Sequence, residues 1–166
     1  KIQPIPFGSP DIRTEDIKRL EKSIKSGWLT HGPNSHALEN LFISFTKSKF
    51  ATTVSNCTSG LHLACMALGL TKGDEVIVPA QTHVATAHAA EITGAKIVFA
   101  DVDKQTGNIL ISEIKKKLTK KTKCLIIVHM TGFPCELDEI VKVCKKKNIK
   151  IIEDCAQALG AEINKK

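Results

Sequence analysis

Two short polar segments contain residues whose types and spacing suit the binding of a small charged molecule. The first is SNCTSG at 55–60, which precedes an apolar segment of helical periodicity. A helix N-terminus offers free backbone N–H groups and a partial positive charge to a phosphate, and the hydroxyls of Thr58 and Ser59 would add donors. Capping of the helix by Asn56 or Thr58 is the alternative interpretation. The segment matches neither the P-loop nor the dinucleotide-binding pattern.

The second segment, IIEDCAQALGA at 151–161, has two adjacent carboxylates, Glu153 and Asp154. In a strand these side chains point to opposite faces. A carboxylate at the end of a strand can hold a pyridine nitrogen protonated, and this interaction makes pyridoxal phosphate (PLP) an electron sink. Helix capping by Asp154 is the competing explanation.

Histidines form the third group of candidates. His83 follows an apolar strand and precedes a helical segment, so its imidazole could stack on a flat cofactor ring, although a histidine near a helix start also serves as a structural hydrogen-bonding group. The sequence gives no evident partner for His31, His36, His62 or His88.

Helical and strand patterns alternate along the chain, and the strands are nearly continuous runs of Val and Ile. This pattern is typical of an α/β fold with three layers, in which helices cover both faces of a mostly parallel sheet. The first helix has an approximate capping box from Thr14 to Ile17 and ends at Gly27. We expect helices at 14–27, 36–48, 58–69, 82–92, 111–118 and 136–147, and strands at 50–55, 75–80, 96–102, 123–130 and 149–154.

The strand ends are where a ligand would bind in such a fold. Parallel sheets bind ligands outside the carboxyl ends of their strands. Four of those ends carry polar residues, and all four should project toward one edge of the sheet: 56–60, 81–83, 129–132 and 154–157.

Composition limits the class of protein. The 166 residues, 42% of them hydrophobic, are sufficient for one domain or a large piece of one. Without a long apolar run or a signal peptide, the sequence indicates a cytoplasmic protein with no membrane contact. The net charge is +7, yet 11 of the 24 basic residues lie at 115–123 and 142–150, where they interleave with helical apolar positions, and aromatic residues are only 4%. We therefore expect no nucleic-acid partner.

The six cysteines form no C-x-x-C pair and lie mostly within apolar runs, so they are expected to be free thiols. Neither the cysteines nor the six histidines fall at the spacing of zinc ligands, and no metal site is predicted.

Three segments together resemble the DegT/DnrJ/EryC1/StrS family of sugar aminotransferases. They are GWLTHGPNSHALENLF, the long segment from SNCTSGLHLACMALG to AKIVFADVD, and IIEDCAQALGA. The resemblance covers nearly the whole chain, with the motifs in order and at plausible spacing. It implies a PLP enzyme of fold type I that acts as a homodimer with its active sites at the subunit interface.

The resemblance also implies roles for five residues. Thr58 and Ser59 would hold the cofactor phosphate, His83 would stack on the pyridine ring, Asp154 would pair with the ring nitrogen, and Gln157 would approach the phenolic oxygen. Many relatives have glycine where this chain has Cys57 and an aromatic carbocycle where it has His83.

The reaction implied is transfer of an amino group from glutamate or a similar donor to a keto group of a nucleotide-linked deoxysugar, for surface polysaccharide or glycoconjugate synthesis. It requires a Schiff-base lysine in a downstream S-F-x-x-x-K motif, which the 166 residues do not contain. Lys165 and Lys166 lack that context. We therefore expect 1–166 to be the N-terminal part of the PLP-binding large domain, inactive alone.

Three other functions remain as hypotheses. Some members of this family have histidine in place of the lysine and remove a sugar hydroxyl as dehydratases. A noncatalytic module that binds a sugar nucleotide or PLP would use the same scaffold. A nicotinamide-dependent oxidoreductase also has alternating strands and helices, but the glycine fingerprint after its first strand is absent here.

Overall fold

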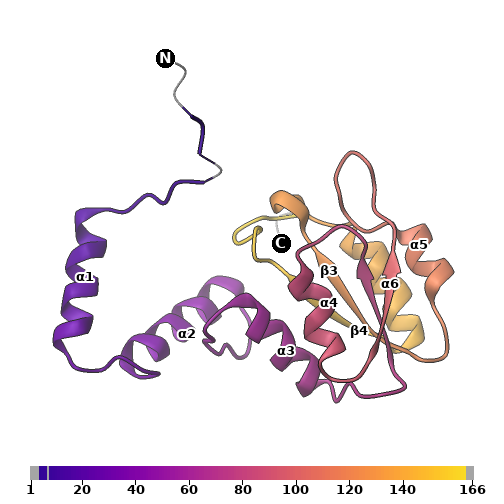
Figure 1. The fold of residues 1–166 in the computed structure, drawn as a ribbon, viewed down its shortest axis with the longest axis horizontal. Coiled ribbons are helices and arrows are strands. Elements are labelled where there is room, and N and C mark those ends of the chain that lie inside the picture. The colour runs from indigo at the N-terminus through magenta and orange to yellow at the C-terminus, as the bar shows by residue number, and fades with distance from the viewer. Residues whose placement is uncertain (1–3, 7, 164–166) are drawn as a thin grey trace. The chain divides into compact units, whose positions relative to one another are not determined.

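The computed structural model describes residues 4–6 and 8–163 and divides the chain into two compact units (Figure 1). The first unit ends at Thr53 and the second begins at Val54. Lys165 and Lys166 lack the sequence context of a Schiff-base lysine, and they lie outside the described residues.

The second unit is built on a four-stranded sheet in the order β2-β1-β3-β4, with every neighbouring pair parallel. This arrangement confirms the predicted α/β fold with a parallel sheet. The strands are β1 (Glu75–Pro79), β2 (Lys96–Ala100), β3 (Thr122–Val128) and β4 (Lys150–Asp154).

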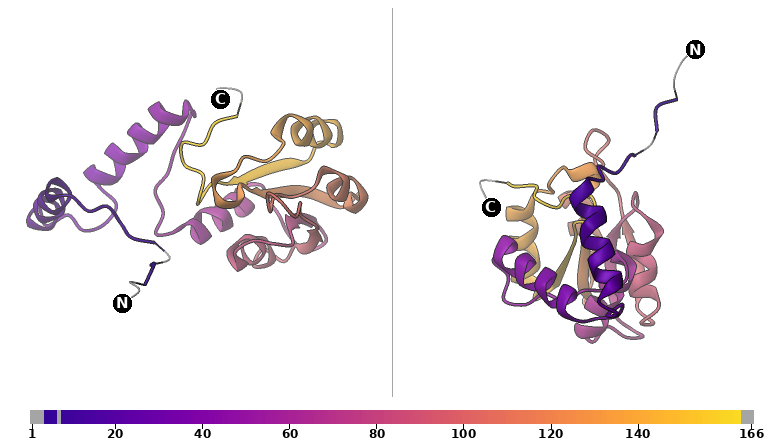
Figure 2. Two further views of the ribbon diagram at one scale, coloured as in Figure 1. Left: turned by 90° about the horizontal axis from the view of Figure 1, so that it is seen from above. Right: turned by 90° about the vertical axis from the view of Figure 1, so that its left-hand side faces the viewer.

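Helices lie on both faces of this sheet, as the continuous apolar strands predicted (Figure 2). They are α3 (Cys57–Ala67), α4 (Val84–Glu91), α5 (Ile111–Lys117) and α6 (Leu137–Lys147), and a short 3-10 turn, η1, spans Met130–Gly132. Successive strand residues point to opposite faces. The first core therefore contains Val76, Val78, Cys124 and Ile126 against α3 and α4, and the second contains Ile77, Leu125 and Ile127 against α5 and α6.

The strand expected at 50–55 is not formed, and this prediction is wrong. Phe50 is 87% exposed, and Thr53 directs its backbone N–H and hydroxyl to the Glu39 carboxylate at 2.8 and 3.0 Å. The preference of aromatic and β-branched residues for strands depends on side-chain packing against neighbouring strands and on burial. Within the described residues, no strand pairs with this segment.

The first unit contains two helices, α1 (Thr14–Lys25) and α2 (Pro33–Thr46). The predicted capping box is shifted by one residue, because Arg13 is the N-cap and its backbone N–H donates to the Asp16 carboxylate at 3.0 Å. Helix α2 begins before the expected position 36, since the fixed φ of Pro33 suits the first helical position. It ends before Lys47, whose φ of 56° is left-handed.

The loop before α2 is closed by the single tryptophan. The Trp28 indole N–H donates to the carbonyl of His31 at 3.1 Å. A Cβ atom at Gly32 would lie 1.6 Å from that indole nitrogen, so only glycine fits beneath the ring. The backbone carbonyl of His31 therefore has a fixed place beside Trp28.

Glu39 pairs with two of the histidines for which the sequence showed no partner, and that expectation is corrected. His31 Nε2 lies 3.0 Å and His36 Nδ1 lies 3.2 Å from the Glu39 carboxylate. The backbone N–H of Thr53, followed by His31, lowers the pKa of Glu39 to about 2, so the side chain is a carboxylate at neutral pH. His88 also has a partner, because its Nε2 lies 3.7 Å from Glu91.

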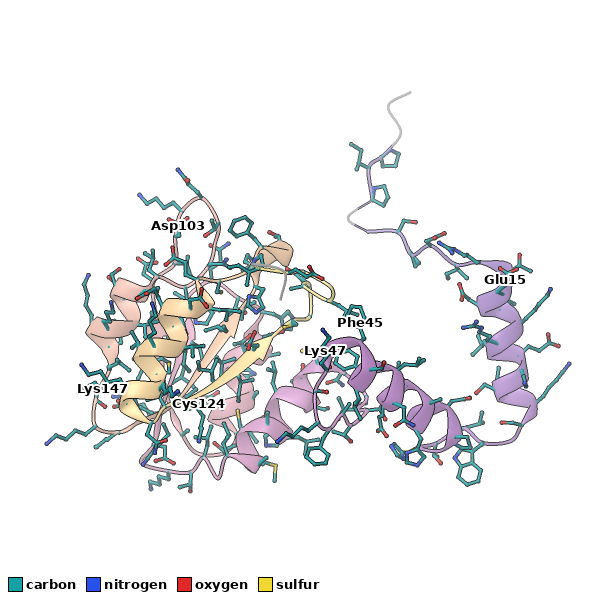
Figure 3. All side chains as sticks on the ribbon, turned by 180° about the vertical axis from the view of Figure 1, so that it is seen from behind. Glu15, Phe45, Lys47, Asp103, Cys124 and Lys147 are labelled. Carbon is teal, nitrogen blue, oxygen red and sulfur yellow. The ribbon has the colours of Figure 1, made fainter. Side chains whose placement is uncertain are left out.

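The six cysteines are free thiols, four of them buried. Cys124 lies inside the sheet, whereas Lys147 lies at the exposed end of α6 (Figure 3).

Among the described residues, no helix is both long and apolar enough to cross a membrane.

Core packing gives a first prediction. Ile126 is fully buried in the core beneath α3 and α4, so Ile126→Ala should leave a cavity and lower the free energy of unfolding by about 2–5 kcal/mol. The control is Ile92→Ala, because Ile92 is 65% exposed, and it should change stability by less than about 0.5 kcal/mol. Denaturant unfolding measures both, and equal losses would contradict the assigned core.

Candidate functional site

The candidate site lies at the carboxyl end of β4 and centres on Asp154. Asp154 is the last residue of the strand and is only 6% exposed. Its Oδ1 accepts a hydrogen bond from the backbone N–H of Ala156 at 3.1 Å and from the Cys57 thiol at 3.6 Å. Its Oδ2 accepts from the Thr86 hydroxyl at 3.3 Å. An ionised carboxyl offers about four acceptor positions, so one remains for a further donor.

Thr86 and Cys57 bring two helices to this carboxylate. Thr86 is a fully buried polar residue of α4, and its hydroxyl also lies 2.9 Å from that of Thr82, one turn earlier. Cys57 is the first residue of α3. Burial, followed by the charge of Asp154, raises the pKa of the Cys57 thiol, so the sulfur keeps its proton and can donate it.

The N-terminus of α3 provides the second part of the site. Asn56 is the N-cap, and its Oδ1 accepts the backbone N–H of Ser59 at 2.9 Å, as the capping interpretation expected. The Ser59 hydroxyl lies 3.3 Å from that of Ser55. Within the described residues, no hydrogen bond involves the Thr58 hydroxyl or the first two N–H groups of the helix, at Cys57 and Thr58. These donors are available to an anion.

His83 is the N-cap of α4, and its Nδ1 accepts the backbone N–H of Ala85 at 3.2 Å. The structural hydrogen bond that the sequence interpretation considered is therefore present. The imidazole remains exposed. Because Nδ1 accepts this hydrogen bond, the N–H of the neutral ring is on Nε2.

Gln157 is positioned by the turn after β3. Its Oε1 accepts the backbone N–H of Thr131 at 3.0 Å, so the amide N–H₂ group is left to donate elsewhere. Thr131 has a left-handed φ of 52°, and a Cβ atom at Gly132 would lie 3.0 Å from the Gln157 carbonyl. The buried amide of Asn108 holds this turn through the Met130 N–H and the Phe133 carbonyl, at 3.0 and 2.9 Å.

Glu153, the other carboxylate of the pair, points away from Asp154 and is exposed. It accepts from His129 Nε2 at 3.2 Å, while His129 Nδ1 accepts the backbone N–H of Cys135 at 3.1 Å. The opposite orientation of the two carboxylates follows from strand geometry, and it leaves Asp154 as the one beside the helix N-termini.

Of the predicted site residues, Asp154 is bridged directly to the start of α3 by the Cys57 thiol, and the next two residues of that helix are Thr58 and Ser59. His83 lies at the start of the helix that contributes Thr86. Sequence reasoning missed the roles of Thr86 and Asn108. The only signal for Thr86 was a hydroxyl within the apolar segment VATAHAAEI.

The donor set fits a molecule with a phosphate and a protonated ring nitrogen. The free N–H and hydroxyl groups at the α3 N-terminus suit the phosphate, and the acceptor position left on buried Asp154 suits the nitrogen. Both features occur at one edge of the sheet, which is the place where parallel sheets bind ligands.

Comparisons with known proteins identify relatives of this chain. The chain is 40% identical to GDP-perosamine synthase of Escherichia coli O157:H7 over 159 residues, which are 95% of this chain and 44% of that protein. An aminotransferase structure from Psychrobacter cryohalolentis matches with a TM-score of 0.89 and 37% identity, over 93% of this chain and 40% of that one. The chain spans less than half the length of the curated relatives that it matches.

A second similar structure is a GDP-4-keto-6-deoxymannose-3-dehydratase solved with a trapped PLP-glutamate species. It matches with a TM-score of 0.92 and 31% identity, over 98% of this chain and 44% of that one. The family model of the DegT/DnrJ/EryC1/StrS aminotransferases matches residues 10–166. The match covers nearly the whole chain, and the chain has the fold of these relatives. The chain therefore belongs to the DegT/DnrJ/EryC1/StrS aminotransferase family.

Proposed function

We propose that this chain forms the cofactor-binding part of a PLP-dependent aminotransferase that acts on a nucleotide-linked keto-deoxysugar. The observation that carries the proposal is the buried Asp154 carboxylate, held by three donors beside the free N-terminus of α3. Family membership and the name of the GDP-perosamine synthase relative support the same substrate class.

The cofactor phosphate would bind at the start of α3. The free backbone N–H groups of Cys57 and Thr58 point out of the helix end, and the Thr58 hydroxyl adds a donor. Ser59 would contribute through its hydroxyl, because its N–H already binds Asn56. This division of roles refines the expectation that both residues hold the phosphate.

The pyridine ring would lie between His83 and Asp154. The carboxylate of Asp154 would accept the ring N–H and hold that proton, while the Cys57 and Thr86 donors keep the carboxylate in place. The exposed imidazole of His83 would cover the ring, and the free amide N–H₂ group of Gln157 would donate to the phenolic oxygen. When bound in this way, PLP supplies an electron sink for proton removal from the amino donor.

The amino donor and the reactive lysine are further parts of the proposal. Glutamate is the donor we infer, supported by the PLP-glutamate species in the dehydratase relative. The 166 residues contain no S-F-x-x-x-K motif, so a longer protein would supply the lysine. We also propose the homodimer that the resemblance implies, a state that size-exclusion chromatography of the whole protein would test, and a cytoplasmic location, as the sequence composition indicates.

A second candidate function is dehydration of the same class of sugar. This chain shares the fold of the dehydratase relative over nearly its whole length, and this similarity favours dehydration as the alternative activity. The two activities share the Asp154 site and differ in the product, which carries a new amino group in one case and lacks a hydroxyl in the other.

The role of Asp154 gives a direct prediction. Asp154→Asn removes the charge that holds the ring N–H, and a hydrogen bond to a charged group is worth about 1.5–3 kcal/mol. PLP affinity should fall about 10- to 100-fold, measured by absorbance of the bound cofactor. Glu153→Gln is the matched control, because Glu153 is the exposed neighbour, and it should bind PLP like the wild type. Equal affinity in all three proteins would disprove the assignment.

Thr86 should act as a positioning residue for Asp154. Thr86→Val keeps the shape but removes the hydroxyl, so the carboxylate is less fixed and PLP affinity should fall, with a change in the absorbance maximum of bound PLP. Thr86→Ser restores the donor and should recover both properties. A merely structural role would lower thermal stability in Thr86→Val and leave the spectrum unchanged.

Product analysis separates the two candidate activities. The whole protein, incubated with PLP, glutamate and a GDP-linked 4-keto-6-deoxysugar, should release 2-oxoglutarate in proportion to an aminated sugar detected by mass spectrometry. The 166-residue chain alone should give no product, since it lacks the lysine motif. Loss of a hydroxyl instead of gain of an amino group would support the dehydratase, and turnover by the 166-residue chain would contradict the need for a further segment.

A further inference from the structure

A second cluster of reactive side chains lies in the first unit, outside the proposed PLP site. His31 comes from the loop before α2, and His36 and Glu39 lie one turn apart on the helix itself. The His31 Nε2 atom is 3.0 Å from Glu39 Oε1, and the His36 Nδ1 atom is 3.2 Å from Glu39 Oε2. With one ligand-type atom taken from each of the three residues, these atoms all lie within 4.8 Å of one another.

The Glu39 carboxylate is held in place before any ligand arrives. Its Oε1 accepts both the backbone N–H and the hydroxyl of Thr53, at 2.8 and 3.0 Å. Its Oε2 contacts only His36 among the described residues. The side chain is 12% exposed, whereas those of His31 and His36 are 51% and 64% exposed. Thr53 therefore anchors the Glu39 carboxylate, and the two imidazoles that the carboxylate faces are exposed to solvent.

The separations agree with the coordination of zinc. Zn²⁺ binds imidazole nitrogen and carboxylate oxygen at about 2.0–2.2 Å, which places neighbouring ligand atoms of a tetrahedron about 3.3 Å apart. His31 Nε2 lies near that separation from Glu39 Oε1, and His36 Nδ1 lies near it from Oε2. A single ion bound through Oε2, the oxygen that does not bind Thr53, would require the exposed His31 ring to turn toward that oxygen. The third edge joins the two imidazoles, whose exposed rings can rotate to close it. Such a site would leave a fourth position for water.

The protonation of the rings also permits a metal ion. A neutral imidazole that binds a metal through one nitrogen must carry its proton on the other. The outer nitrogens of His31 and His36 make no hydrogen bond among the described residues, and water can solvate an N–H there. Each ring can therefore move its proton outward and direct a lone pair inward.

A comparable group elsewhere fails this requirement. His129, Glu153 and Cys155 also gather within 4.8 Å. However, His129 Nδ1 accepts the backbone N–H of Cys135 at 3.1 Å, so the proton must remain on Nε2, the nitrogen that faces the group. A metal ion there would have to break a buried hydrogen bond.

We propose that His31, His36 and Glu39 form a binding site for one Zn²⁺ ion. The ion would join the loop before α2 to the helix and, through the bonds of Glu39 to Thr53, to the end of the first unit. Trp28 donates to the carbonyl of His31 and is the only tryptophan in the chain, so its fluorescence reports on this loop.

The test is a zinc titration of the purified protein, in buffer without PLP or amino acids, against a chromophoric chelator. Wild type should bind one Zn²⁺ at this site and show a change in Trp28 fluorescence at the same stoichiometry. Co²⁺ should give the visible absorption of a tetrahedral nitrogen and oxygen site. Zn²⁺ should also raise the thermal midpoint, because a ligand that binds only the folded state stabilises it.

Two variants remove single ligands and should retain the fold. His36→Ala removes an exposed ring, and Glu39→Gln keeps an oxygen for the Thr53 bonds while removing the charge. Zinc affinity should fall at least about tenfold in each, and the fluorescence change should disappear. The matched control is His88→Ala, because His88 pairs with Glu91 at 3.7 Å without a second histidine. It should bind zinc like the wild type.

The proposal is overturned if His36→Ala and Glu39→Gln bind zinc within twofold of the wild type, or if His88→Ala loses the same affinity. It is also overturned if Cys155→Ser, but not His36→Ala, abolishes the tightest binding, since the ion would then occupy the His129 group. Circular dichroism of every variant should match the wild type. If a variant is unfolded, His31→Asn provides the equivalent loss of one ligand from the loop.

Discussion

The buried carboxylate of Asp154 is the constraint on which the second unit depends. A charge withdrawn from water is costly unless donors surround it. Here the donors come from α3 through Cys57, from α4 through Thr86, and from the backbone after β4 through Ala156. The same contacts that compensate the charge also fix the starts of two helices beside it. The arrangement leaves an acceptor position on the carboxylate and free N–H groups at α3, directed to one edge of the sheet.

Glu39 has a related role in the first unit. Its carboxylate binds Thr53 and both histidines, so one charge connects the loop before α2, the helix and the residues that follow. The two acids differ in what surrounds them. Asp154 contacts a thiol, a hydroxyl and a backbone N–H, which suits an organic cation such as a pyridinium group. Glu39 contacts two imidazoles, which suits a metal ion.

The sequence predicted the features that depend on local pattern. Continuous Val and Ile runs located the four strands, and the end of the last strand located Asp154 and Gln157. The α3 start was located by the polar residues that precede an apolar segment of helical periodicity, not by a strand. The expectation of PLP agrees with the PLP-glutamate species of the similar dehydratase. The strand at 50–55 was wrong because propensity does not reveal whether a neighbouring strand exists. Thr86 and the pairing of Glu39 with His31 were missed, since these contacts join residues that only the folded chain brings together. The five cofactor-site roles stay predictions.

A crystal structure of the protein with PLP bound would test the role of Asp154 most directly. We expect the pyridine nitrogen within hydrogen-bond distance of the Asp154 carboxylate, with the phosphate against the free N–H groups at the start of α3. A cofactor whose ring nitrogen faces solvent, or whose phosphate binds away from α3, would contradict this expectation.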